Sequence, residues 1–259
     1  MIRGRTVLAV LRYEWETMIS LKSGLALLFA ALLSASSTVV TAASLSPAER
    51  LGSDGAAFTQ TVVEAPMGFL AVMLYVFGAL SLGNEYRYRR LLVLHVIVPR
   101  RHVSYLAKLS FALAVGGLGV LAVLAVGVLL TWTNGDFTVL RTPGGTLTAF
   151  VSIGLKSLAA ALFYVTVAFS TTALTGSTLW GLLTPVLASS IVEAALLLAL
   201  AHRAPWLSYV LPFSAARQTL GLGTGTPAPG GLGQEYAIIF AWSVALALSG
   251  GYRYVRREC

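Results

Sequence analysis

Two charged side chains, Lys156 and Glu193, each stand alone within a run of about twenty apolar residues. A charge at the centre of a bilayer costs about 2.5–3.5 kcal/mol or more, so such residues usually pair, face a bundle interior or take part in function. On consecutive antiparallel helices, both would lie about 12–14 Å below the same membrane boundary, at about 1.5 Å per residue. We therefore predict an intramembrane ion pair between them. It would serve as a structural strut, as a substrate or gate contact, or as a proton relay.

Several kinds of catalytic chemistry lack the residues that they need. None of the three lysines, Lys22, Lys108 and Lys156, follows a glycine, so there is no phosphate-binding G-x-x-x-x-G-K-[ST] loop. The long apolar runs contain no histidine or aspartate, which leaves an intramembrane protease without paired catalytic groups. There is no H-E-x-x-H sequence, and the single cysteine, Cys259, cannot form a disulfide within the chain. We expect no catalytic, cofactor-binding or metal-binding residues, and no enzymatic activity, on this chain.

The composition is typical of an integral membrane protein. Of the 259 residues, 57% are hydrophobic and 11% are charged, whereas a soluble domain carries about 25% charged residues. No second, soluble domain fits, so we predict one all-α membrane domain over residues 1–259. The net charge of +8 is explained better by cationic loops kept on the cytoplasmic side of a membrane than by a nucleic-acid partner.

Six segments are long enough to cross the hydrocarbon core, which needs about 20 apolar residues. The sixth is short and would need its flanking residues or local thinning of the bilayer. The predicted spans are residues 23–45, 65–84, 109–132, 147–172, 179–201 and 237–252.

An even number of spans places both termini on the same side of the membrane. That side would hold 13 basic residues against 4 on the other, so the positive-inside rule predicts cytoplasmic amino and carboxyl termini. Arginine outnumbers lysine 15 to 3, which fits a bacterial chain from a GC-rich genome. We predict a multi-pass protein of the bacterial plasma membrane.

Residues 1–22 have the period of an amphipathic helix. Val7, Leu11, Trp15 and Met18 fall on one face, and basic and polar residues fall opposite. We predict a helix that lies in the membrane interface, anchored by Trp15. The alternative is a soluble amphipathic helix that packs on a partner.

The predicted cytoplasmic loop, residues 85–108, is long enough to hold structure. We predict a short helix over residues 86–98, stopped by Pro99. Two basic clusters flank an aliphatic middle, residues 91–98, which a solvated loop would not need but a helix docked in a groove on another protein would. The alternative role of the arginines is to set topology and to bind anionic membrane lipid.

The predicted external segment, residues 202–234, begins with a part that is too apolar for a free loop. This part contains Trp206, Tyr209, Pro212 and Phe213. The Gly- and Pro-rich residues 221–233 that follow read as a flexible connector.

The chain resembles the permeases of type-2 (ABC-2) ABC export transporters. The resemblance rests on Glu85-Tyr86-Arg87, the Leu-rich turn after it, Pro99-Arg100-Arg101 and the Leu-Ala-Lys entry to the next span. The length, the six spans, the amphipathic amino-terminal helix and the long segment between spans five and six also match. The family often has a Gly-Thr pair where this chain has Arg89-Arg90.

The resemblance implies that the loop is a coupling helix seated on a separate ATPase subunit, and that residues 6–20 form a connecting helix beside it. The external segment would be a re-entrant outer gate with Trp206, Tyr209, Pro212 and Phe213. Two permease chains, identical or sister chains, would bind two ATPase subunits, which hold ATP and Mg²⁺. The implied coupling residues are Glu85, Tyr86, Arg87, Arg89, Arg90, Leu91, Leu92, His95, Pro99, Arg100 and Arg101.

The leading hypothesis is therefore the membrane subunit of an ATP-driven exporter. Spans one and five carry almost no aromatic residues, so a lipophilic drug, an antibiotic or a hydrophobic peptide is favoured over a polysaccharide, with antibiotic resistance as a consequence. One alternative is a gradient-driven transporter or channel that uses Lys156 and Glu193. Another is a structural or sensory membrane subunit without transport.

Overall fold

The computed structural model describes most of the apolar helices and leaves several connecting segments outside its description. Every regular element among the described residues is helical. The described residues are Arg12, 55–87, 101–133, 146–200, Arg203, Trp206, 210–219 and 231–256.

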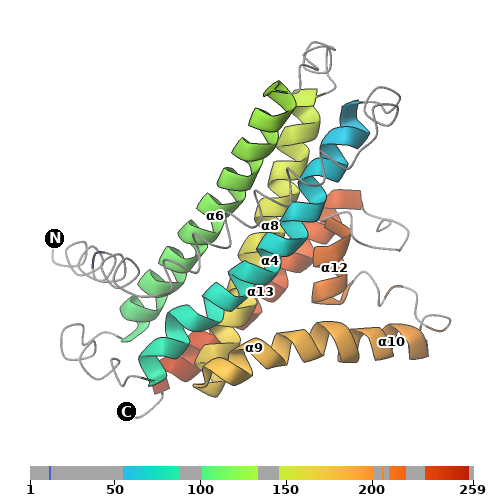
Figure 1. Ribbon diagram of the computed structural model, residues 1–259. Helices are drawn as coiled ribbons and strands as arrows, with labels where there is room; N and C mark the ends of the chain where they lie inside the picture. Colours follow the sequence, from blue (N-terminus) through green and yellow to red (C-terminus); the bar gives the residue numbers. More distant parts are fainter. Residues whose placement is uncertain are drawn as a thin grey trace.

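Four long helices form a bundle: α4 (Gly55–Arg87), α6 (Arg101–Thr133), α8 (Thr146–Thr175) and α13 (Gly231–Arg256). In Figure 1 they run alongside one another, with α8 among the other three. One end of the bundle carries Arg87, Arg101 and Arg256, and we call it the basic end. The opposite end is called the far end.

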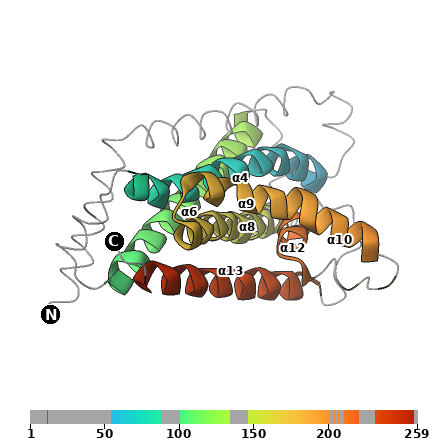
Figure 2. The same cartoon turned by 90° about the horizontal axis from the view of Figure 1, so that it is seen from below.

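A second, thinner part of the molecule consists of three helical segments in a row and one separate short helix. The row contains α9 (Thr178–Leu187), the π-helical turn η1 (Ala188–Val192) and α10 (Glu193–Leu200). It starts at the basic end and diverges from the bundle (Figure 1). The short helix α12 (Pro212–Thr219) lies between this row and the bundle (Figure 2).

The chain is a helical membrane protein by the length and composition of its helices. Four described segments are long and apolar enough to cross a bilayer: Arg101–Val126, Gly154–Thr175, Thr178–Leu200 and Gly233–Arg256. They fall on predicted spans three to six. The apolar stretch Leu70–Tyr86 of α4, on predicted span two, is shorter. The first span and the amphipathic segment, except Arg12, lie outside the described residues, so the six-span layout stays a prediction.

Two predicted boundaries differ from the structure, and both differences lengthen helices. The loop at 85–108 is too long as predicted, because α4 continues to Arg87 and α6 begins at Arg101. Residues 88–100, with most of the predicted coupling helix, lie outside the described residues. The predicted sixth span is short, but α13 extends it at both ends to 26 residues, so no thinning of the bilayer is required.

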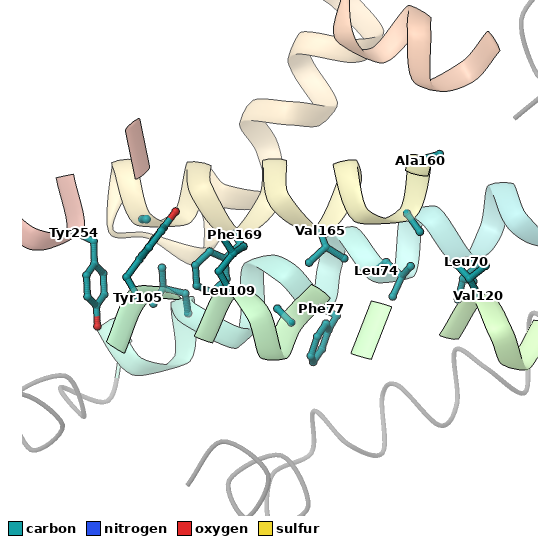
Figure 3. Packing of buried hydrophobic residues seen from close by; sticks show 14 of the residues in the cluster. Leu70, Leu74, Phe77, Tyr105, Leu109, Val120, Ala160, Val165, Phe169 and Tyr254 are labelled. Carbon is teal, nitrogen blue, oxygen red and sulfur yellow. The ribbon is translucent and has the colours of Figure 1, made fainter. Parts of the chain in front are cut away.

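The core is built around α8. In its apolar window, 67% of residues are buried, against 11–28% in the other three, so α8 is the central helix. Its Val165 and Phe169 pack with Leu74 of α4 and with Tyr105 of α6 (Figure 3). Small residues let these helices approach closely: a Cβ on Gly78 would lie 2.8 Å from the backbone oxygen of Val165.

The turn from α8 to α9 is tight, and glycine is needed there. Gly176 has φ 69°, a left-handed conformation that side chains disfavour. Beyond the turn, α9 packs so closely on its neighbours that a Cβ on Gly181 would lie 1.9 Å from Oγ1 of Thr172. A Cβ on Gly83 of α4 would lie 2.1 Å from Oγ1 of Thr178, the first residue of α9. The start of α9 is therefore interlocked with both α4 and α8.

Candidate functional site

The row α9–η1–α10 is interrupted by a proline and a π-helical turn. Pro185 has no N–H, so the backbone oxygen of Gly181 loses its usual helical partner. The hydroxyl of Thr171 on α8 donates to that oxygen at 3.1 Å, which is how transmembrane helices tolerate an internal proline. The π turn η1 follows directly, and such turns occur often at functional sites.

Glu193 is the first residue after the π turn, and its carboxylate holds the amino end of α12. One carboxylate oxygen accepts the backbone N–H of Phe213 at 2.9 Å. The other accepts the backbone N–H of Ser214 at 2.9 Å and its hydroxyl at 3.2 Å. The first N–H groups of a helix have no partner within the helix and carry partial positive charge, so a carboxylate there is stabilised. Glu193 is 4% exposed, so these hydrogen bonds are shielded from solvent.

A second contact joins α12 to the same row. The guanidinium of Arg217 donates to the backbone oxygen of Ser189, within η1, at 2.6 Å. The π turn and α12 are thus joined at both ends of the short helix. We call Ser189, Glu193, Phe213, Ser214 and Arg217 the Glu193 clasp.

Aromatic packing holds α12 against the middle of the bundle. Phe213 is 5% exposed, and its ring lies 5.5 Å from that of Phe163 and 6.3 Å from that of Tyr164, both on α8. On α13, the indole N–H of Trp242 donates to the backbone oxygen of Val210 at 3.0 Å. Because Phe163 lies well inside α8, the segment after α10 returns into the bundle instead of staying beyond the far end.

Lys156 does not take the place predicted for it. Its side chain is half-buried on α8, and within the described part of the chain no ion pair joins it to Glu193. The carboxylate of Glu193 is instead bound by α12. The physical reason is the path of the chain: α10 diverges from α8, and α12 fills the space between them (Figure 1).

The basic end contains a buried ion pair that the sequence reasoning missed. Nζ of Lys108 on α6 contacts Oε1 of Glu85 on α4. The two residues are 2% and 4% exposed. From the sequence, Glu85 was expected to contact an ATPase and Lys108 to end the cytoplasmic loop at the entry to the next span. The signal that could have shown that they are buried is the apolar sequence on either side of them.

Hydroxyl groups extend this pair into a polar cluster. The hydroxyls of Ser104 and Tyr254 lie 3.4 Å apart. The hydroxyl of Tyr105 donates to the backbone oxygen of Ala247 at 3.0 Å. The ring of Tyr105 lies 5.4 Å from that of Tyr254 (Figure 3). We call Glu85, Lys108, Ser104, Tyr105 and Tyr254 the basic-end cluster, and it joins α4, α6 and α13.

The other residues implied for ATPase coupling fall in two groups. Tyr86 is half-buried near the end of α4, Arg87 is the last residue of that helix, and Arg101 begins α6 and donates to the backbone oxygen of Val255 at 3.3 Å. The rest lie outside the described residues: Arg89, Arg90, Leu91, Leu92, His95, Pro99 and Arg100.

The residues predicted for an outer gate are also divided. Trp206 is 59% exposed, Pro212 begins α12 and Phe213 is buried. Tyr209 and the predicted interfacial anchor Trp15 lie outside the described residues. Within the described ranges, no three His, Cys, Asp or Glu side chains gather as metal ligands.

The chain has no match among the known proteins and families compared with it. No protein-family model matches the chain, and no curated protein does.

Proposed function

We propose that this chain is the membrane subunit of an ATP-driven exporter of the ABC-2 type. It would move a lipophilic drug, an antibiotic or a hydrophobic peptide out of the cell. The observation that carries the proposal is the buried Glu85–Lys108 pair, since it joins the two helix ends from which residues 88–100 emerge.

A loop that transmits movement from another protein must be attached to helices that are fixed to each other. The charge pair lies between the last turns of α4 and the first turns of α6 and is almost fully buried. Separating two buried, paired charges leaves each without compensation, so the two helix ends move as one body. A displacement of residues 91–98 by a partner would therefore move α4 and α6 together.

The same end of the bundle is interlocked with α9. Gly83, two residues before Glu85, allows close contact with Thr178, and Gly181 allows close contact with Thr172. A displacement of α4 would therefore move the start of α9. That row continues through η1 to Glu193, which holds α12. These contacts offer a continuous route from the loop to the re-entrant helix.

The π turn and Pro185 give this route a place to bend. A π turn lacks the regular i to i−4 hydrogen bonds, and the proline removes one more. Bending at η1 would move Glu193, and with it the amino end of α12, toward or away from Phe163 and Tyr164. We propose that α12 works as the outer gate in this way, with substrate passing between two permease chains.

The energy would come from two partner ATPase chains, which hold ATP and Mg²⁺. The sequence has no phosphate-binding loop of its own. The gradient-driven alternative would use Lys156 and Glu193 as one ionisable site. It gains no support from the clasp, because both carboxylate oxygens of Glu193 face α12.

Transport in inverted membrane vesicles tests the proposal. The vesicles contain this chain co-expressed with a P-loop ATPase that co-purifies with it, and uptake of a fluorescent lipophilic dye is followed. We expect uptake to require ATP, to stop with vanadate and to persist with a protonophore. Uptake that stops with the protonophore and ignores vanadate would instead support the gradient-driven alternative.

Crosslinking tests the contact itself. Leu94→Cys, in the middle of the aliphatic stretch, should form a disulfide with cysteines introduced along the ATPase cleft. The matched control is Leu198→Cys, because Leu198 lies on α10 and is 83% exposed. Equal crosslinking of both variants, or of neither, would contradict the proposal.

A further inference from the structure

A groove of about 460 Å³ lies between α6 and α13 at the basic end. Its walls are mainly apolar, and charged or polar groups stand at one end. The lining includes His102, Leu106, Leu248, Gly251, Tyr252 and Arg256.

The groove exists because α6 and α13 meet over a short length. Ser104 and Tyr105 of α6 contact Ala247 and Tyr254 of α13. Arg101, at the start of α6, also donates to the backbone oxygen of Val255. From this meeting point the two helices diverge (Figure 2). Gly251 adds depth, because a Cβ there would lie 3.0 Å from the ring of Tyr105. The result is a slot whose floor is the buried ring of Tyr105.

The sides of the slot suit a hydrocarbon chain. Leu106 on α6 is 59% exposed, and Leu248 on α13 is 68% exposed. Both belong to segments that are apolar enough to span a membrane. An apolar slot between two helices that cross a bilayer faces lipid tails wherever no protein covers it.

The mouth of the slot carries a positioned cation. The guanidinium of Arg256 lies 4.3 Å from the centre of the Tyr252 ring, a cation–π contact that holds it beside the groove. His102, in the first turn of α6, adds a ring N–H donor on the other side. Cations beside an apolar slot between spanning helices are complementary to an anionic lipid head group.

We propose that this groove binds one anionic phospholipid, with an acyl chain along Leu106 and Leu248 and the phosphate at Arg256 and His102. A zwitterionic lipid fills the slot equally well but carries no net charge to meet Arg256. The groove shares Tyr105 with the basic-end cluster but is lined by neither Glu85 nor Lys108, so the absence of a bound lipid would leave the proposed function standing. It would make the stability of the α6–α13 contact depend on lipid composition.

Native mass spectrometry of the protein from mixed micelles tests this proposal. The micelles contain equal amounts of phosphatidylglycerol and phosphatidylcholine. We expect the wild-type chain to retain one phosphatidylglycerol in preference to phosphatidylcholine. Arg256→Gln should lower that preference about fivefold, the effect of one cation near an anionic head group. Arg256→Lys, which keeps the charge, should restore most of it.

The matched control is Arg253→Gln. Arg253 is also exposed and lies in the last turn of α13, but it does not line the groove. Its replacement should change the preference by less than about twofold. His102→Gln should have an intermediate effect. The proposal is overturned if the Arg253 and Arg256 variants behave alike, if neither changes lipid retention, or if the wild-type chain retains no phosphatidylglycerol.

Discussion

Two carboxylates, Glu85 and Glu193, are buried to the same extent, each 4% exposed, yet they are stabilised differently. Glu85 meets the ammonium of Lys108 on another helix. Glu193 meets backbone N–H groups and a hydroxyl at the start of α12. The first arrangement places a full opposite charge against the carboxylate, and the second uses helix dipoles and hydrogen bonds. Burial alone therefore does not tell which kind of partner an intramembrane charge will have.

The two arrangements also differ in what they constrain. The ion pair fixes α4 against α6 at the base of the predicted coupling loop. The Glu193 clasp fixes a short helix on the far side of a π turn. Losing one member of the ion pair leaves a buried charge without compensation, whereas losing the clasp charge leaves amides that another acceptor can satisfy.

The largest expected effect is that of breaking the ion pair on one side. Lys108→Met should lower the free energy of unfolding by about 3–5 kcal/mol, because Glu85 then stays buried without its cation. Unfolding in SDS, followed by circular dichroism, measures the change. The double variant Glu85→Gln, Lys108→Met should recover most of the loss. Strictly additive losses would contradict the pair.

The next largest effect is expected where α9 packs on α8, between the Glu85–Lys108 pair and the Glu193 clasp. Gly181→Ala should lower the free energy of unfolding by about 1–3 kcal/mol, because the new methyl group overlaps Thr172. Adding Thr172→Ala removes the hydroxyl that is overlapped and should restore part of the stability. Thermal unfolding by fluorescence-detected size exclusion compares the variants. Gly181→Ala with unchanged stability would disprove the close packing of α9 on α8.

A smaller effect is expected at the clasp. Glu193→Gln should cost about 1–2 kcal/mol, since the amide oxygen still accepts one hydrogen bond while the charge at the helix start is lost. Hydrogen exchange of the α12 amides should quicken, while that of α6 stays unchanged. The loss should be smaller than that of Glu85→Gln, which leaves Lys108 buried without its partner. A larger loss of stability for Glu193→Gln than for Glu85→Gln would contradict the difference proposed between the two carboxylates.

The smallest expected effect is the coupling free energy between Lys156 and Glu193. A double-mutant cycle with Lys156→Met and Glu193→Gln should give a coupling free energy below about 0.5 kcal/mol, because no contact joins the two residues in the described structure. The same cycle at Glu85 and Lys108 should give a much larger value. A coupling above about 1 kcal/mol would restore the ion pair expected from the sequence.

The helical class and four of the spans could be predicted because they depend on local properties. Runs of about 20 apolar residues cannot leave backbone groups unpaired in lipid, so they form helices wherever they pack. The apolar start of the external segment also predicted packing, and Phe213 is buried in the core with Phe163. Pro212 at the first position of α12 is a usual start for a helix.

The partners of the buried charges could not be predicted in the same way. Similar depth on consecutive helices suggested that Lys156 would meet Glu193, but depth says nothing about which face of a helix points where. The π turn adds to the uncertainty, because one extra residue in a turn rotates everything after it. The extent of the loop at 85–108 was also wrong, because charged residues at helix ends can be buried when they pair.

The sequence by itself determined that this chain is a helical membrane protein, and it located the apolar segments that cross the bilayer, because hydrophobicity and length are properties of one segment at a time. Only the tertiary structure decided that Glu85 pairs with Lys108, that Glu193 holds α12, and that α6 and α13 open a groove. Each of these depends on how helices far apart in the chain are rotated and tilted against one another, which is set by the packing of many side chains together.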